Sequence, residues 1–269
     1  MTIRVSQAQT RVSRPARVTR ARGVLVPLVL GLLVLALWQL AVVGFGIKPY
    51  VLPSPTAIAI QLARAFATIW AGTWVTGTNA LLGLLLGAVV GILTAMVSAR
   101  SRLVDQVTLP VVTAIGVVPI VALAPVLYTM FGAGEQTGRQ IIAALAVFIP
   151  VYLNTLRGLR QVRPVHRDLL RAYAATAWQA TRTVTLPGAV PYIFTGLRIA
   201  SSLAVISALV AEYFGGPADG LGKSITSAAA YSNYALAYAF VVGAIVLGLA
   251  FYLTTRALEE FSTRHRSAA

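Results

Sequence analysis

Long apolar stretches recur along the chain, separated by shorter polar segments. Each holds about 20 residues with few charges, the length a helix needs to cross a hydrocarbon core of about 30 Å. They lie at residues 24–45, 74–98, 107–131, 140–156, 188–214 and 235–258. The pattern predicts an all-α integral membrane protein with about six transmembrane helices. A membrane domain at 23–258 would lie between short tails at 1–22 and 259–269.

Two of these stretches carry residues with a specific structural meaning. Gly83, Gly87 and Gly91 recur every fourth residue, which predicts a helix face that a neighbouring helix approaches closely. The third stretch contains Pro110, Pro119 and Pro125. Proline bends a helix and frees carbonyl groups that need partners. We therefore expect a kinked third span that faces other helices or a solute pathway.

Shorter helices are expected outside the spans. Thr56 is a candidate N-cap for a helix that ends near Trp70 and lies at the membrane interface. The glycine-rich run 215–220 predicts an external turn, and 224–234 a second short helix.

Basic residues are distributed unevenly over the connections. The chain is 58% hydrophobic and 11% charged, with a net charge of +15. Arginines gather before the first span and after the second, fourth and sixth, at positions 4, 11, 14, 17, 20, 22, 100, 102, 157, 160, 163, 167, 171, 182, 256, 264 and 266. The alternate connections hold only Lys48, Arg64, Arg139 and Lys223. This asymmetry places both termini in the cytoplasm and explains the basic charge without a nucleic-acid partner.

The sequence contains no set of residues typical of an enzyme. Cysteine is absent, and the two histidines, His166 and His265, lie in arginine-rich segments outside the spans. No glycine- and lysine-rich phosphate loop is present, so we expect this chain not to bind or hydrolyse ATP itself. No metal site is expected either.

The segment 157–187 is longer than a simple connection requires. A short helix is expected after Pro164, with Asp168 near its positive N-terminus and Leu170, Arg171, Tyr173 and Ala174 within the next turns. Such a helix suits a groove in a soluble protein. It equally suits the inner leaflet, where arginines and Trp178 would anchor it. Spacing alone leaves both interpretations open.

Three stretches resemble the permease family of bacterial ATP-binding-cassette importers. They are 52–58, LPSPTAI; 168–193, which combines DLLRAYAATAWQ with LPGAVPYI; and 196–214, which runs from GLRIA to AEYF. The likeness covers residues 50–260 and is nearest to permeases for nitrate, sulfonates, taurine and vitamin or pyrimidine precursors. Asp168 stands in place of a glutamate and Ala174 in place of a glycine. Alanine resists positive φ, so the turn is either right-handed here or differs in geometry.

The resemblance implies the fold and the partners. It implies a type I importer permease fold, in the bacterial cytoplasmic membrane, that carries a small polar or anionic solute. A cytoplasmic ATPase, which binds ATP and magnesium, would dock on Asp168, Leu170, Arg171, Tyr173, Ala174 and Ala175. This chain would hold no cofactor. An extracytoplasmic solute-binding protein and a second permease copy, giving a homodimer in membrane lipid, would complete the assembly.

Polar residues inside the spans are candidates for the solute pathway. They are Asn79, Ser201, Ser202 and Glu212, together with Pro119 of the third span. Glu212 also suits the outer water interface, and the others suit helix–helix hydrogen bonds. At the inner interface we expect Asp105 to pair with Arg100 or Arg102, and Arg198 to extend to the headgroups.

Two other functions remain open at this point. A secondary transporter driven by an ion gradient would need buried ionisable residues near the midplane, and the spans offer few. A membrane-anchored scaffold would need no proline-kinked span.

Overall fold

The computed structural model describes residues 20–162 and 164–264, and these form helices and no strands. Residues 1–19 of the expected basic tail, and His265, lie outside the described residues. The helices are α1 (Arg20–Gly44), α2 (Pro55–Arg64), α3 (Phe66–Arg100), α4 (Arg102–Val117), η1 (Ile120–Leu123), α5 (Ala124–Phe131), α6 (Thr137–Arg160), α7 (Pro164–Ala172), α8 (Ala177–Ala180), η2 (Thr181–Thr185), α9 (Leu186–Tyr213), α10 (Leu221–Ala230) and α11 (Tyr234–Arg264).

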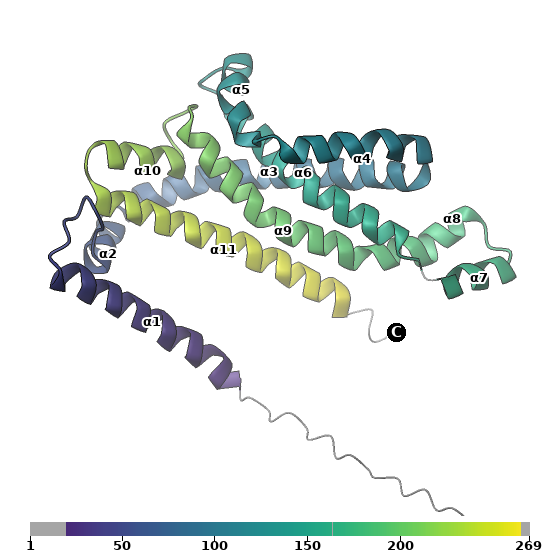
Figure 1. Cartoon of the computed structure of the whole chain (residues 1–269), viewed down its shortest axis with the longest axis horizontal. Coiled ribbons are helices and arrows are strands. Elements are labelled where there is room, and N and C mark those ends of the chain that lie inside the picture. The colour runs from purple at the N-terminus through teal and green to yellow at the C-terminus, as the bar shows by residue number, and fades with distance from the viewer. Residues whose placement is uncertain (1–19, 163, 265–269) are drawn as a thin grey trace, which may run out of the picture.

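Four long helices form the body of the molecule. Helix α6 packs against both α3 and α9, and α11 packs against α9 (Figure 1). Helices α2 and α10 lie at one end of the bundle, and α7 and α8 lie at the other, near the end of α11 (Figure 1). Helix α1 stands apart, with Val42 as its one buried apolar side chain among those described. The arginine distribution makes the α7–α8 end the cytoplasmic one.

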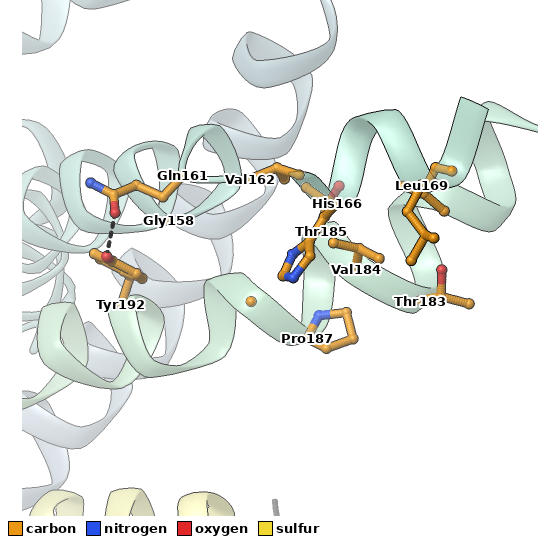
Figure 2. A pocket seen from close by; sticks show the side chains of 12 residues that line it. Gly158, Gln161, Val162, His166, Leu169, Thr183, Val184, Thr185, Pro187 and Tyr192 are labelled. Atoms are coloured by element: carbon orange, nitrogen blue, oxygen red, sulfur yellow. Dashed lines mark hydrogen bonds between the residues drawn. The ribbon is translucent and has the colours of Figure 1, made fainter. Parts of the chain in front are cut away.

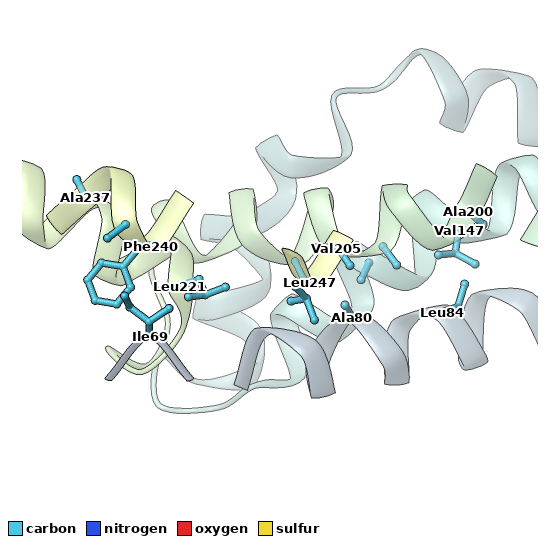
Figure 3. Packing of buried hydrophobic residues seen from close by; sticks show 14 of the residues in the cluster. Ile69, Ala80, Leu84, Val147, Ala200, Val205, Leu221, Ala237, Phe240 and Leu247 are labelled. Carbon is cyan, nitrogen blue, oxygen red and sulfur yellow. The ribbon is translucent and has the colours of Figure 1, made fainter. Parts of the chain in front are cut away.

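The core between the long helices is built from small and branched side chains. Ala80 of α3, Val147 of α6 and Ala200 of α9 are fully buried in one cluster, which continues to Phe240 and Leu247 of α11 (Figure 3). Within a membrane, helices gain stability mainly from such close packing, because lipid is as apolar as the side chains.

The third span is broken rather than kinked. Helix α4 ends at Val117, and η1 and α5 continue at an angle of 84° to it. Val118 is extended at φ −70° and ψ 131°, as expected for a residue before proline, and Pro119 has no N–H to continue the helix. Among the described residues, five helices are therefore long and apolar enough to cross a membrane, or six if the bent pair is one span.

The short helix after the first span differs from the prediction at both ends. Ser54, not Thr56, is the N-cap, because its Oγ accepts from the Ala57 N–H at 3.3 Å and Pro55 occupies the first helical position. The helix ends at Arg64, and the residues up to Trp70 belong to α3.

The glycine row on α3 faces α6, in agreement with the prediction. A Cβ on Gly83 would overlap Ala143, and a Cβ on Gly87 would overlap the Ala144 carbonyl and Val147. A Cβ on Gly91 would lie 3.1 Å from the Phe148 carbonyl oxygen, a tight contact without overlap. The absence of side chains at these three positions sets the distance between the two central helices.

Ion pairs at the inner ends differ from the predicted ones. Asp105 lies 2.7 Å from the Arg160 guanidinium, because the start of α4 and the end of α6 meet there. Arg198 of α9 lies 3.2 Å from Glu259 of α11. Both pairs join two helices, so they fasten the inner end of the bundle instead of pairing within one connection or with headgroups.

Gly87→Ala tests the close approach of α3 and α6. The added methyl group would press on the Ala144 carbonyl, and overpacking of this kind costs about 1–3 kcal/mol. We expect a lower midpoint for heat-induced loss of monodisperse protein in detergent. Gly31→Ala in α1 is the matched control, because nothing lies within 4 Å of its Cβ position. Equal midpoints for the two variants would contradict this packing.

Candidate functional site

The segment between α6 and α9 folds as two short helices joined by a tight turn. The Ala174 N–H donates to the Arg171 carbonyl at 2.9 Å, and the Ala175 N–H donates to the Leu170 carbonyl at 2.9 Å. This pair of bonds is a Schellman motif that ends α7. Ala174 takes the left-handed position of the motif, at φ 48°.

The turn is therefore left-handed although alanine replaces the expected glycine. An L-residue in this region costs roughly 1–2 kcal/mol relative to the right-handed one. The two backbone hydrogen bonds and the following cap hold the alanine there. The geometry that glycine would give is kept, and alanine carries local strain.

A second helix starts directly after the turn. Thr176 caps α8: the Gln179 N–H donates to its Oγ1 at 3.3 Å, and its own N–H donates to the Gln179 side chain at 2.8 Å. This capping box satisfies donors that the helix start leaves open. The chain then passes through the π-helical turn η2 into α9, so 177–213 forms one uninterrupted helical stretch.

The outer face of this segment is exposed and partly apolar. Tyr173 is 78% exposed and Trp178 is 68% exposed. Asp168 and Arg171 form an exposed pair at 3.6 Å, which contributes little stability. Leu170 and Ala175 are half-buried. The six residues predicted to dock an ATPase thus lie on one helix and its C-terminal turn.

A cavity of about 730 Å³ separates α7 from the start of α9. Its walls include His166 and Leu169 of α7 and Thr183 of η2 (Figure 2). On the opposite side the Tyr192 hydroxyl donates to the Gln161 side chain at 2.6 Å. This space lies beneath α7, and the Schellman turn at its C-terminal end joins the helix to α8.

At the other end of the bundle lies a buried polar network. Arg139 of α6 and Glu212 of α9 are both fully buried, with Arg139 Nη1 3.9 Å from Glu212 Oε1. Two buried charges need each other and further hydrogen bonds to offset the loss of water. Gln136, the N-cap of α6, accepts from Arg139 Nη1 at 2.7 Å.

Glu212 also organises the start of α10. The Thr76 hydroxyl donates to its carboxylate at 2.9 Å, and the Gly222 N–H donates to the same carboxylate at 2.6 Å. Thr76 in turn accepts from the Leu221 N–H at 2.9 Å. A carboxylate at a helix N-terminus satisfies free N–H groups and complements the helix dipole. A Cβ on Gly220 would overlap this carboxylate, so the backbone passes there only without a side chain.

The predicted pathway residues do not form one lining. Asn79 and Glu212 both belong to the polar network, where Asn79 donates to Gln136 at 2.8 Å. Ser201 is fully buried and lies 3.2 Å from the Thr255 hydroxyl of α11. Ser202 is half-buried beside an apolar groove between α9 and α11, and exposed Pro119 marks the break in the third span.

Reasoning from the sequence missed Arg139 as a partner of Glu212. Its sequence position marks Arg139 only as one of few basic residues outside the cytoplasm, and nothing in the sequence links it to Thr76, Gln136 or Asp219. One signal was present: an arginine at the start of an apolar span, on the side where arginine is rare, calls for a buried partner.

Comparison with known proteins supplies the family context. The family described as binding-protein-dependent transport system inner membrane component matches residues 83–265. A probable ABC transporter permease protein of Haemophilus influenzae is 31% identical, covering 85% of this chain and 92% of that protein. The riboflavin transport system permease protein of Chloroflexus aurantiacus is 30% identical and covers 87% of each chain. Other relatives are named as permeases for formylaminopyrimidine, aliphatic sulfonates, taurine and nitrate.

A solved structure shares the fold. The crystal structure of an amino acid ABC transporter with histidines superposes with a TM-score of 0.62 at 19% identity, covering 75% of this chain and 97% of the other.

Glu212→Leu tests whether the polar network holds the outer end together. The change leaves Arg139 with Asp219, 2.9 Å away, as its acidic partner, but it removes the acceptor of the Thr76 hydroxyl and the Gly222 N–H. Each buried group left unsatisfied costs about 1–3 kcal/mol. We expect thermal unfolding, monitored by tryptophan fluorescence, to have a much lower midpoint than in the wild-type protein. Exposed Glu135, one residue before Gln136, is the control, and Glu135→Leu should change stability by less than about 0.5 kcal/mol. A wild-type midpoint for Glu212→Leu would show that the pair is dispensable.

Ala174→Gly should relieve the strain in the turn at Ala174. Glycine adopts positive φ freely, so we expect slower amide hydrogen exchange at residues 174 and 175, by a factor that corresponds to about 1 kcal/mol. Ala172 lies two residues earlier, inside α7. Ala172→Gly should make amide hydrogen exchange at residues 174 and 175 faster, because glycine costs about 1 kcal/mol in a helix. The same sign for both variants would rule out a strained turn.

Proposed function

The chain belongs to the family of binding-protein-dependent transport system inner membrane components, and on that premise we propose how it works. It is a multi-pass inner-membrane permease of the ATP-binding-cassette importer type. We propose that a cytoplasmic ATPase docks on the segment 157–187 and drives the spans between inward-open and outward-open states. The single observation that carries this proposal is the exposed helix α7, which a Schellman turn and a capping box join to the stretch 177–213 that enters a membrane span.

The docking surface consists of the six residues Asp168, Leu170, Arg171, Tyr173, Ala174 and Ala175. Tyr173 supplies exposed aromatic area, and the nearby Trp178 adds to it. Aromatic side chains and arginine are the residues that contribute most to protein interfaces. On the membrane interpretation the same side chains would enter the inner leaflet. The family membership favours the ATPase.

The ATPase supplies the nucleotide chemistry in this proposal. ATP and magnesium are held by that partner, and this chain contributes no cofactor site. ATP binding would then move α7 and α8 as one body, since the capping box and the Schellman turn tie them together. The uninterrupted stretch 177–213 spans about 55 Å at 1.5 Å per residue, so the displacement reaches the outer end of α9 directly.

The remaining partners follow from the same proposal. A solute-binding protein delivers solute at the end that carries α10, opposite to the docking segment. A second copy of this chain completes the pathway as a homodimer, and α4, with exposed Leu103 and Val107, offers it an apolar face. Lipid covers the remaining apolar surface.

The solute we propose is a small polar or anionic organic molecule of the sulfonate, taurine, nitrate or vitamin-precursor type. The relatives named for such solutes support this range. An ion-gradient transporter is the weaker alternative. It needs an ionisable side chain free to take up the coupling ion. Glu212 is engaged by Arg139, Thr76 and Gly222 instead.

Purification of the tagged chain from its native membrane tests the docking proposal. We expect an ATPase subunit to co-purify and hydrolyse ATP. Tyr173→Glu, at the centre of the exposed face, should lower the ATPase recovered about tenfold or more, the loss expected when an aromatic anchor is removed. Phe261→Glu is the control, because Phe261 is equally exposed at the cytoplasmic end but lies on α11. Equal recovery with both variants would refute docking on this segment.

Uptake measurements with the complex of permease and ATPase, reconstituted in proteoliposomes, test the solute class. ATP-dependent uptake of taurine, an alkanesulfonate, nitrate or riboflavin by proteoliposomes with the binding protein supports the import proposal. Uptake driven by a proton or sodium gradient without ATP would support the alternative.

A further inference from the structure

The connection between α9 and α10, Phe214–Gly220, lies across the start of α6, and we name it the outer strap. Asp219 Oδ1 lies 2.9 Å from Arg139 Nη1, and Arg139 Nη2 donates to the Pro217 carbonyl. The Gln136 side-chain amide donates to the other Asp219 oxygen at 2.7 Å. Two polar side chains at the start of α6, those of Gln136 and Arg139, thus hold the strap.

The two acidic partners of Arg139 differ in their surroundings. Glu212 is fully buried and is held by Thr76 and Gly222 as well. Asp219 is 42% exposed, so water can replace its contacts when it leaves. Withdrawal of Asp219 leaves Arg139 with Glu212 as a buried partner at 3.9 Å. Withdrawal of Glu212 would instead leave the buried Thr76 hydroxyl and the Gly222 N–H without their acceptor. The arrangement permits release on the strap side alone.

The strap also holds the outer half of the broken span. Ideal Cβ atoms on Gly215 and Gly216 would lie 3.1 and 3.0 Å from the Tyr128 ring of α5, so the strap passes flat against that ring. The Tyr128 hydroxyl donates to the Ala211 carbonyl at 3.0 Å, just before the strap. Helix α5 joins α4 through the 84° break at Pro119. A movement of the strap therefore removes one of the surfaces that hold α5, beside Gly138 of α6 and the Ala211 carbonyl of α9, and the break provides the hinge.

The position of the strap links it to the docking segment. It begins where the stretch 177–213 ends, and the tight turn at Ala174 joins the proposed ATPase contact to the start of that stretch. If α9 shifts along its axis or turns about it, Phe214 moves first, and the contact between Asp219 and Arg139 is disturbed next.

We propose that the outer strap and α5 form the outer closure of the solute pathway, fastened at Arg139 and Gln136 by Asp219 and released in the ATP-bound state. Glu212 is the positioning residue that keeps Arg139 in place while the strap is away. This inference rests on the function proposed above and adds the outer element on which the ATPase acts.

Thiol crosslinking tests the release, because the sequence has no cysteine. Gln136→Cys with Asp219→Cys places a pair where the side chains now form a hydrogen bond, and a short bis-methanethiosulfonate spans it. The Pro217 and Tyr128 contacts still hold the strap in this variant. The complex with its ATPase and binding protein is compared without nucleotide and with ATP, using an ATPase variant that binds ATP without hydrolysing it. We expect the crosslinked fraction to fall about fivefold or more with ATP, as for a two-state shift.

The control pair is Gln39→Cys with Thr56→Cys, at the outer end of α1 and α2. The Thr56 N–H donates to the Gln39 side chain at 3.2 Å, so this pair is similarly close but lies away from the strap. Its crosslinked fraction should stay the same with ATP. An unchanged yield for the strap pair would overturn the inference, and so would an equal fall for both pairs. Failure to recover any ATPase is detected before the crosslinker is added and removes the proposed function itself.

Discussion

The pairing of Arg139 with Glu212 is the interaction on which the outer half of this protein depends. Both side chains are fully buried, so neither charge is hydrated and each requires a partner. The pairing and its hydrogen bonds bring together the ends of α3, α6 and α9 and the start of α10. This connection requires glycine at positions 220 and 222, because a side chain at either position would overlap Glu212.

The two ends of the bundle are held in physically different ways. At the outer end a charged network and glycine contacts leave the helix ends little freedom. At the inner end α7 stands over a cavity, exposes Tyr173, and ends in the tight turn at Ala174. Helix α9, with α8 and η2, connects these ends without a break. An exposed surface joined by one continuous helical stretch to the outer network suits the transmission of a displacement across the membrane.

The turn at Ala174 shows that a left-handed backbone conformation can form without glycine. Glycine is the residue that a left-handed helix end favours. Here Ala174 takes that conformation, because the bonds to Leu170 and Arg171 and the cap at Thr176 require the chain to reverse there. The turn therefore keeps the left-handed conformation that glycine would favour, with alanine in its place.

Features that depend on local sequence were predictable without a structure. The length of the apolar stretches identified the spans, and the asymmetry of the arginines gave the orientation. Gly83, Gly87 and Gly91 indicated a packing face. Each of these features depends on residues that are consecutive or regularly spaced in the sequence. Tertiary structure alone decided which polar residues meet. Thr76 and Glu212 are 136 residues apart in sequence, and Arg139 and Asp219 are 80 apart. It also decided that Pro119 breaks its span and that Asp105 pairs with Arg160, since both outcomes depend on what a neighbouring helix offers in place of water.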